Sequence, residues 1–387
     1  MSFAALTVIS VVGLLGPLLA LPRRWYLPVV LGELAGGVLL GPSVVNYLHA
    51  GDPTFTFLAD IGFALVMFVA GSHVPMRDAA IFKGYRNGLL RALGVAVLAV
   101  PVAVAIAKLF GTGHWAVYAV LMASSSAALV LPVVDSLHLR GGPVLETLAQ
   151  VAIADTVCIV ALPLAINPGR AGQAALGGLA ILVSTAAIFV VLRHAERSGI
   201  RRRLHRLSEE RKFALELRIS LAILFGLAAL AVLTHVSIML AGFCLGLVVS
   251  AIGEPRRLAR QLFAVTEGFF GPLFFVWLGS SLDLRQLGRH LSFILLGLLL
   301  GIGAIAVHAV MRASGQPGPL AVLTCAQMGV PVAAATLGSQ LHLLKPGEPA
   351  ALMLSALVTM AAVAVSGNFS IKAGLGEPPE PHPHPGR

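Results

Sequence analysis

The stretch 148-LAQVAIADTVCIVALPLAI-166 decides how this chain folds, because it is an apolar run just long enough to cross a bilayer. Asp155, near its middle, is the only ionisable residue in it. A charge at that depth costs roughly 2.5–3.5 kcal/mol on insertion scales, so an intramembrane carboxylate is interpreted first as a functional residue. The structural alternative is a protonated Asp that is hydrogen-bonded within a helix bundle.

The whole chain is as apolar as this stretch. It is 57% hydrophobic and 11% charged, whereas a soluble domain is about 25% charged. Apolar runs of about 17–25 residues are typical of membrane helices. We count about thirteen and predict an all-α polytopic membrane protein. The runs lie at 3–21, 28–48, 57–75, 88–110, 115–134, 148–166, 174–193, 213–233, 237–252, 260–280, 291–312, 318–341 and 349–371. Residues 1–371 then form one transport domain, and the Pro-rich segment 372–387 is expected to be a disordered tail.

The basic residues predict the orientation of these helices. When the loops are assigned to alternating sides, 22 of the 27 Lys and Arg residues fall on one side. That side is expected to be cytoplasmic, with the N-terminus outside and the C-terminus inside. The densest basic segment, 193-RHAERSGIRRRLHRLSEERK-212, is then a cytoplasmic loop against anionic lipid headgroups. It has no aromatic interleaving, so we expect no nucleic-acid partner. The three Cys residues show no metal-type or disulfide spacing, and no cofactor is expected.

Two of the runs have unusual interiors. One reads 121-LMASSSAALVLPVVD-135, with Ser124, Ser125, Ser126 and Pro132, and the other reads 323-LTCAQMGVPVAAATLGSQ-340, with Gln327, Gly329 and Pro331. Irregular backbone at membrane depth is tolerated only where protein or a water-filled cavity satisfies it. If runs two to six and nine to thirteen are two five-helix units, each of these segments is fourth in its unit. The units start seven runs apart and would insert in opposite orientations. This pattern predicts inverted repeats with two crossed broken helices at a transporter binding site.

Several motifs resemble those of the monovalent cation:proton antiporter family. They are 28-PVVLGELAGGVLLGPS-43, 59-ADIGFALVMFVAGSHV-74, 123-ASSSAALVLPVV-134, Asp155 and 270-FGPLFFVWLGSSLDL-284, in the family's order. The resemblance covers about residues 10–370. It implies a thirteen-helix fold in which a core domain moves against a scaffold domain, an ion site where the broken helices cross, and a homodimer.

The chain departs from the family pattern at two positions. The family usually has Asp-Asp or Asn-Asp where this chain has Ala154-Asp155. Many members also have Lys or Arg in the span after the Phe-Phe motif, and His308 stands near that position in 291-LSFILLGLLLGIGAIAVHAVMR-312. No nucleotide-binding domain follows the last span, unlike in the potassium efflux members. The chain is therefore similar to a bare transport module.

These residues suggest how a proton and a cation could exchange. A carboxyl that is removed from water favours its neutral form, so Asp155 could bind either a proton or a cation. Alkali cations prefer oxygen ligands, as harder ions do. The hydroxyls of Ser124, Ser125 and Ser126, the amide oxygen of Gln327, and carbonyls freed around Pro132 and Pro331 could supply them. His308 and Glu267 are candidates for proton coupling. The alternatives are a packed core histidine for His308 and an internal ion-pair partner for Glu267.

The leading hypothesis is a secondary transporter in the cell membrane that exchanges protons for Na⁺ or K⁺. With one membrane carboxylate, one proton exchanges for one cation, which predicts electroneutral exchange. One alternative is a passive cation channel with the same fold. Another is a non-transporting sensor or partner subunit descended from an antiporter, which the departures at Ala154 and His308 would fit. An enzyme is not expected, because the spans show no nucleophile–base pair or metal constellation.

Overall fold

The computed structural model describes residues 1–21, 29–72, 79–166, 169, 171–199, 213–234, 236–253, 256–281, 285, 288 and 291–375. All the regular elements in these ranges are helical. Eight of the described helices are long and apolar enough to cross a membrane, judged by length and composition. Helices suit these apolar residues because a helix satisfies its backbone hydrogen bonds internally, without water. The count of thirteen spans stays a prediction, as does the disordered tail, whose residues 376–387 lie outside the described ranges.

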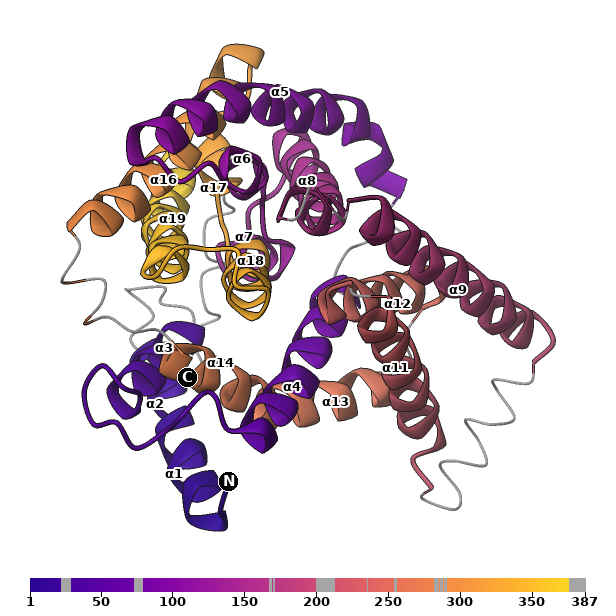
Figure 1. Ribbon diagram of the computed structural model, residues 1–387. Coiled ribbons are helices and arrows are strands. Elements are labelled where there is room, and N and C mark those ends of the chain that lie inside the picture. Colours follow the sequence, from indigo (N-terminus) through magenta and orange to yellow (C-terminus); the bar gives the residue numbers. More distant parts are fainter. Residues whose placement is uncertain are drawn as a thin grey trace, which may run out of the picture.

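The helices form two groups that are visible in Figure 1. The group that we call the scaffold bundle lies in the lower and right-hand part of the view. It consists of α1 (Phe3–Gly13), α2 (Leu15–Ala20), α3 (Val29–Leu40), α4 (Pro53–Ser72), α9 (Ala171–Arg197), α11 (Leu215–Leu233), α12 (Ile238–Ile252), α13 (Arg256–Val265), the π-helical turn η2 (Thr266–Phe270) and α14 (Gly271–Ser281).

The second group, which we call the core bundle, lies in the upper part of the view. It consists of α5 (Ala79–Phe110), α6 (Trp115–Ala123), α7 (Ala127–Ser136), α8 (Gly142–Ile166), α16 (Leu291–Ala309), the 3-10 turn η3 (Val310–Ser314), α17 (Gly318–Leu323), α18 (Gly329–Gln340) and α19 (Glu348–Lys372). Helices of each bundle pack mainly on helices of the same bundle.

Glycines bring two helix pairs of the scaffold bundle into backbone contact. In the α4–α12 pair, a Cβ added at Gly71 would lie 2.3 Å from the Phe243 carbonyl oxygen, and one at Gly246 would lie 2.3 Å from that of Phe68. In the α3–α14 pair, a Cβ at Gly37 would lie 2.2 Å from the Val276 carbonyl oxygen. Small residues allow such approach where lipid supplies no hydrophobic drive between helices. The scaffold is therefore assembled from tightly apposed pairs.

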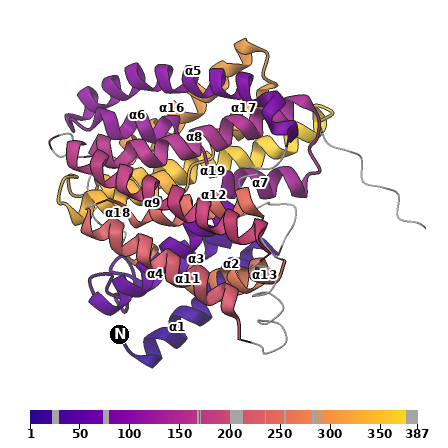
Figure 2. The same cartoon turned by 90° about the vertical axis from the view of Figure 1, so that its right-hand side faces the viewer.

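Two helices of the core bundle are interrupted in mid-course. The first consists of α6 and α7 and the second of α17 and α18. In Figure 2, α6 and α18 lie toward one end of the bundle, and α7 and α17 lie toward the other. In Figure 2, the two interrupted helices run across the bundle in opposite directions. Their interruptions therefore meet inside the core bundle.

Candidate ion site

The first interruption is a run of three serines, Ser124 to Ser126, between α6 and α7. Ser124 has extended backbone, with φ −72° and ψ 153°, so the α6 helix cannot continue through it. Serine suits this position because its hydroxyl competes with the helical hydrogen bonds of the backbone. The Ser124 hydroxyl donates to the Leu121 carbonyl at 2.7 Å. The Ser125 hydroxyl is buried and has no hydrogen-bond partner among the described residues.

Asp155 closes this interruption from the neighbouring helix α8. Its Oδ2 accepts a hydrogen bond from the backbone N–H of Ala127, the first residue of α7, at 2.9 Å. The first N–H groups of a helix have no partner within it, and the helix dipole favours negative charge there. Asp155 is 5% exposed and forms no salt bridge with the described residues. The carboxyl group therefore serves as a buried cap without a counter-ion.

The second interruption spans residues 324–328, and it is tied to the first through Gln327. The Gln327 Nε2 donates to the Leu121 carbonyl at 2.7 Å. Its Oε1 accepts a hydrogen bond from the Ser355 hydroxyl of α19 at 3.3 Å. Gln327 and Ser124 thus share one carbonyl at the end of α6, although they are about two hundred residues apart in the chain.

Both interruptions lie on the N-terminal side of the prolines that indicated broken helices in the sequence. Pro132 falls inside α7, six residues beyond Ser126. Pro331 is the third residue of α18, where a backbone N–H would have no intrahelical partner anyway. The irregular backbone itself belongs to the serine run and to residues 324–328, just ahead of Pro132 and Pro331. Gly329, the first residue of α18, faces the scaffold, because a Cβ there would lie 3.6 Å from the Met67 side chain of α4.

The structure does not bring Glu267 into this group. Glu267 lies in η2 of the scaffold bundle, is exposed, and acts electrostatically on the buried Glu33 of α3. His308, by contrast, lies in the core bundle near the end of α16 and is 1% exposed. Its Nδ1 lies 2.7 Å from the hydroxyl oxygen of Thr324, at the second interruption. Of the residues assigned from the sequence, Glu267 is the one that stands apart from the interruptions.

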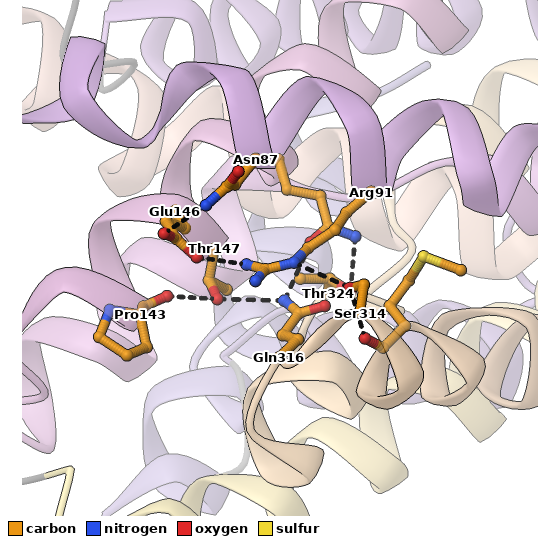
Figure 3. Close-up of polar contacts among 10 residues, drawn as sticks. Asn87, Arg91, Pro143, Glu146, Thr147, Ser314, Gln316 and Thr324 are labelled. Carbon is orange, nitrogen blue, oxygen red and sulfur yellow. Dashed lines mark hydrogen bonds and ion pairs between the residues drawn. The ribbon is translucent and has the colours of Figure 1, made fainter.

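A buried polar network that sequence reasoning missed leads from Thr324 to one end of the core bundle (Figure 3). Gln150 of α8 donates to the Thr324 hydroxyl at 3.5 Å and accepts from Gln316 at 2.9 Å. Gln316 also donates to the Thr147 hydroxyl at 3.2 Å. Arg91 lies at the end of the same region, 2.7 Å from Glu146 and 3.2 Å from the Ser314 hydroxyl. The only sequence signal was Gln150 itself, a polar residue in the same run as Asp155.

A cavity of about 300 Å³ lies between the two bundles. Its scaffold wall includes Asp60 and Phe63 of α4, together with Val236 and the first residues of α12. Its core wall is the second half of α18, with Leu341 just beyond it. This cavity marks a place where the two bundles face each other without close packing.

Comparison with known proteins gives one family for almost the whole chain. A family model described as "Sodium/hydrogen exchanger, transmembrane" matches residues 8–369. The Na(+)/H(+) antiporter NhaS5 of Synechocystis is 27% identical over 335 residues, which make up 82% of this chain and 46% of that protein. YjbQ of Bacillus subtilis is 24% identical over 383 residues, 92% of this chain and 61% of its own length. The chain therefore spans less than two thirds of the length of these two relatives.

The fold also matches a solved structure. The sodium proton antiporter MjNhaP1 from Methanocaldococcus jannaschii, at pH 8, superimposes with a TM-score of 0.65 over 97% of this chain and 99% of that one. The sequences are 13% identical in this match, so the likeness concerns the fold alone.

Proposed function

The chain belongs to the sodium/hydrogen exchanger family, and from that premise we propose that it exchanges protons for a monovalent cation, Na⁺ or K⁺, across the cell membrane. The observation that carries the proposal is the buried, unpaired Asp155 at the start of α7. A carboxylate at membrane depth without a counter-ion needs a proton or a cation to neutralise it. The carboxylate of Asp155 cannot hold a proton and a cation at the same time. Binding of one ion therefore requires release of the other, which couples their two fluxes.

The cation is expected to find oxygen ligands around Asp155. The hydroxyls of Ser124, Ser125 and Ser126 stand at the first interruption, and the unpartnered Ser125 hydroxyl has a lone pair to offer. The amide oxygen of Gln327 comes from the second interruption. Hard alkali cations favour such neutral and anionic oxygens. We assign the cation to these residues, with proton-coupling roles for His308 and, from the scaffold side, for Glu267.

We further propose that the site alternates between the two sides of the membrane as the core bundle moves against the scaffold bundle. The cavity between Asp60 and α18 supports this, because a loosely packed boundary can slide more easily than the glycine-tight pairs within the scaffold. In this proposal the chain has thirteen spans, with its N-terminus outside and its C-terminus in the cytoplasm. It works as a homodimer, in which residues 1–371 are the transport domain.

The packing supports the inverted repeat that the sequence suggests. With α3 to α8 as one unit and α12 to α19 as the other, the α4–α12 contact in the scaffold has the α14–α3 contact as its counterpart. In the core, the α5–α8 contact likewise corresponds to that of α16 with α19. Contacts that recur between corresponding helices are what two related units produce.

Proton movement in proteoliposomes tests the function. We expect an internal pH dye to respond when Na⁺ or K⁺ is added outside, and we expect the response to vanish in Asp155→Asn. The substitution keeps the size of the side chain but removes the exchangeable charge. Asp52→Asn, at the start of α4 and outside the proposed site, serves as the control. Because one proton should exchange for one cation, the response should also stay unchanged under an imposed membrane voltage.

Other results would redirect the proposal. Dissipation of a cation gradient without proton movement would show a channel. A correctly inserted protein that moves neither ion would be a sensor or partner subunit. Dependence of the exchange on voltage, at about 2.3 kcal/mol per charge for each 100 mV, would overturn the electroneutral scheme.

A further inference from the structure

The hydroxyl of Thr324 determines which nitrogen of His308 carries the proton. A threonine hydroxyl has a single hydrogen to donate, and that of Thr324 goes to the Ala321 carbonyl at 2.7 Å. The short contact of 2.7 Å between Thr324 and the His308 Nδ1 can then be a hydrogen bond only if Nδ1 is the donor. A neutral His308 is thereby held in the tautomer with hydrogen on Nδ1. Its Nε2 has a free lone pair.

The other nitrogen of the ring meets no donor. The His308 Nε2 is buried and has no hydrogen-bond partner among the described residues. The backbone group that acts on the ring is the Met122 carbonyl, in the last turn of α6. A carbonyl oxygen can accept a hydrogen bond but cannot donate one. Because Nδ1 already donates to Thr324, Nε2 is the nitrogen that would donate to this carbonyl once the ring is protonated.

A charged ring would also suit its position between two helix ends. Met122 belongs to the end of α6, and Thr324 follows the end of α17. The carboxyl end of a helix dipole favours a cation. The imidazolium would donate from both nitrogens, to Thr324 and to the Met122 carbonyl, and would join the two interrupted helices through α16.

Buried amides keep the Thr324 hydroxyl in place. Gln150 donates to it from α8 and is itself held by Gln316, which also binds Thr147. Figure 3 shows Thr324 within this group, with Gln316 reaching toward Thr147. All four residues are at most 1% exposed. The network leaves the Gln316 Oε1 without a partner among the described residues, but its hydrogen bonds still restrict where the Thr324 hydroxyl can lie.

Among the described residues, the elements packed against α16 bring no ionic partner to the ring. On α5, Arg91 pairs with Glu146, and Lys108 is exposed in the last turn. On η3, Arg312 is exposed, and on α19, Glu348 and Lys372 stand at opposite ends of the helix. Glu348 binds Tyr118 of α6. Along α17 there is no acid or base. Burial disfavours the charged form of the ring, so the hydrogen bonds of the imidazolium, rather than a neighbouring charge, would have to offset that cost.

We propose that Thr324 is a positioning residue: it fixes the tautomer of His308 so that Nε2 can accept a proton and clamp α16 to the end of α6. This second proton stays within the core bundle and sets the pH dependence of exchange, whereas the exchanged proton is that of Asp155. The effect on exchange rests on the proposed function, but the tautomer does not.

Nitrogen-15 NMR of histidine-labelled protein tests the tautomer without any transport assay. The signals of His308 are identified by their loss in His308→Gln, among the 12 histidines of the chain. At high pH we expect a hydrogen-bearing Nδ1 and a bare Nε2. Thr324→Val keeps the shape of the side chain but removes the acceptor, so the hydrogen should move to Nε2 and donate to Met122. Thr324→Ser should restore the original pattern.

The pH profile of exchange provides the second readout. Thr324→Val deprives the imidazolium of one acceptor, so the His308-dependent step should move to lower pH by about one pH unit. His308→Gln should abolish that step, and Thr324→Ser should retain it. Thr359→Val is the matched control, because this buried hydroxyl also donates three residues back, to the Ala356 carbonyl at 2.9 Å, but no His308 contact depends on it.

The outcomes separate the two proposals. A bare Nδ1 in the unmodified protein, or a Thr324→Val variant with unchanged NMR pattern and pH profile, would overturn the role of Thr324. An equal shift of the pH profile in Thr359→Val would show that loss of any buried hydroxyl has this effect, and it would also overturn the role of Thr324. The expected tautomer in a protein without exchange would leave the positioning intact and refute the proposed function instead.

Discussion

Two neighbouring serines at the first interruption differ in what they already bind. The Ser124 hydroxyl is committed to the Leu121 carbonyl, whereas that of Ser125 is 2% exposed and has no partner among the described residues. A buried polar group without a partner costs about 1–3 kcal/mol of stability. The protein therefore keeps at Ser125 a group that does not help it fold, as expected of a ligand that waits for its cation.

Ser125→Ala is expected to separate stability from transport. Removing the orphan hydroxyl should leave the melting temperature unchanged or slightly higher. Loss of one cation oxygen should raise the KM for the cation about tenfold, the equivalent of about 1.4 kcal/mol. Melting in detergent and exchange in vesicles measure the two effects. Ser280→Ala is the comparison, because this buried hydroxyl of the scaffold bundle donates to the Trp277 carbonyl at 2.7 Å and lies outside the proposed site. If Ser125→Ala left the KM as unchanged as Ser280→Ala does, Ser125 would be an ordinary core residue.

At this scale the sequence predicts the unusual residues but not their partners. Asp155 and the serines stand out because polar groups are rare in apolar runs. The contact between Gln327 and Leu121, or between Thr324 and His308, joins residues from separate helices, and no local pattern encodes it. The placement of Glu267 shows the converse, since a carboxylate in an apolar run can lie on the other bundle.

At the scale of helices, glycine decides which pairs come into backbone contact. The α4–α12 pair is close enough that the Phe68 carbonyl occupies the place of a side chain on Gly246. The position of the interruptions shows the limit of proline as a sequence signal. Pro331 is accommodated in the first turn of α18, and the irregular backbone lies just before it. At the first interruption, the run of three serines is the better sequence signal, because their hydroxyls compete for the hydrogen bonds of the helix backbone.

Gly246→Ala should push α12 away from α4. The added Cβ would lie 2.3 Å from a backbone oxygen, which cannot rotate aside, and overpacking of this kind typically costs about 1–3 kcal/mol. Gly226→Ala, in α11, meets nothing within 4 Å and should be neutral or stabilising. Melting of the two variants in the same detergent gives the comparison. Equal melting temperatures would show that the helices can separate without loss.

At the scale of the whole molecule, the helices are divided into two bundles that touch each other through few elements. They touch where α8 packs on α9 and α12, and a cavity of about 300 Å³ separates part of α18 from the scaffold. Hydropathy predicted the helices, but it could not predict this division, because lipid-facing and bundle-facing apolar residues look alike in sequence.

Linking the bundles should stop exchange. Val236→Cys and Leu341→Cys place thiols on the scaffold and core walls of the cavity. A reducible bifunctional thiol reagent should lower exchange at least about tenfold, and reduction should restore it, if relative motion limits turnover. The pair Val232→Cys and Val236→Cys, both on the scaffold side, should be insensitive to the reagent. Full exchange by the linked protein would contradict motion at this boundary.

The hydrogen bond from Ala127 uses one oxygen of the Asp155 carboxylate to cap α7, which leaves the other oxygen for the proposed ion exchange. Oδ2 accepts a hydrogen bond from the first backbone amide of α7, and Oδ1 is the oxygen that we propose for the proton or cation. If exchange takes place at Oδ1 as proposed, the start of α7 can stay assembled during turnover. The amide of Ala127 would also lower the cost of leaving the carboxylate charged in a region of low dielectric.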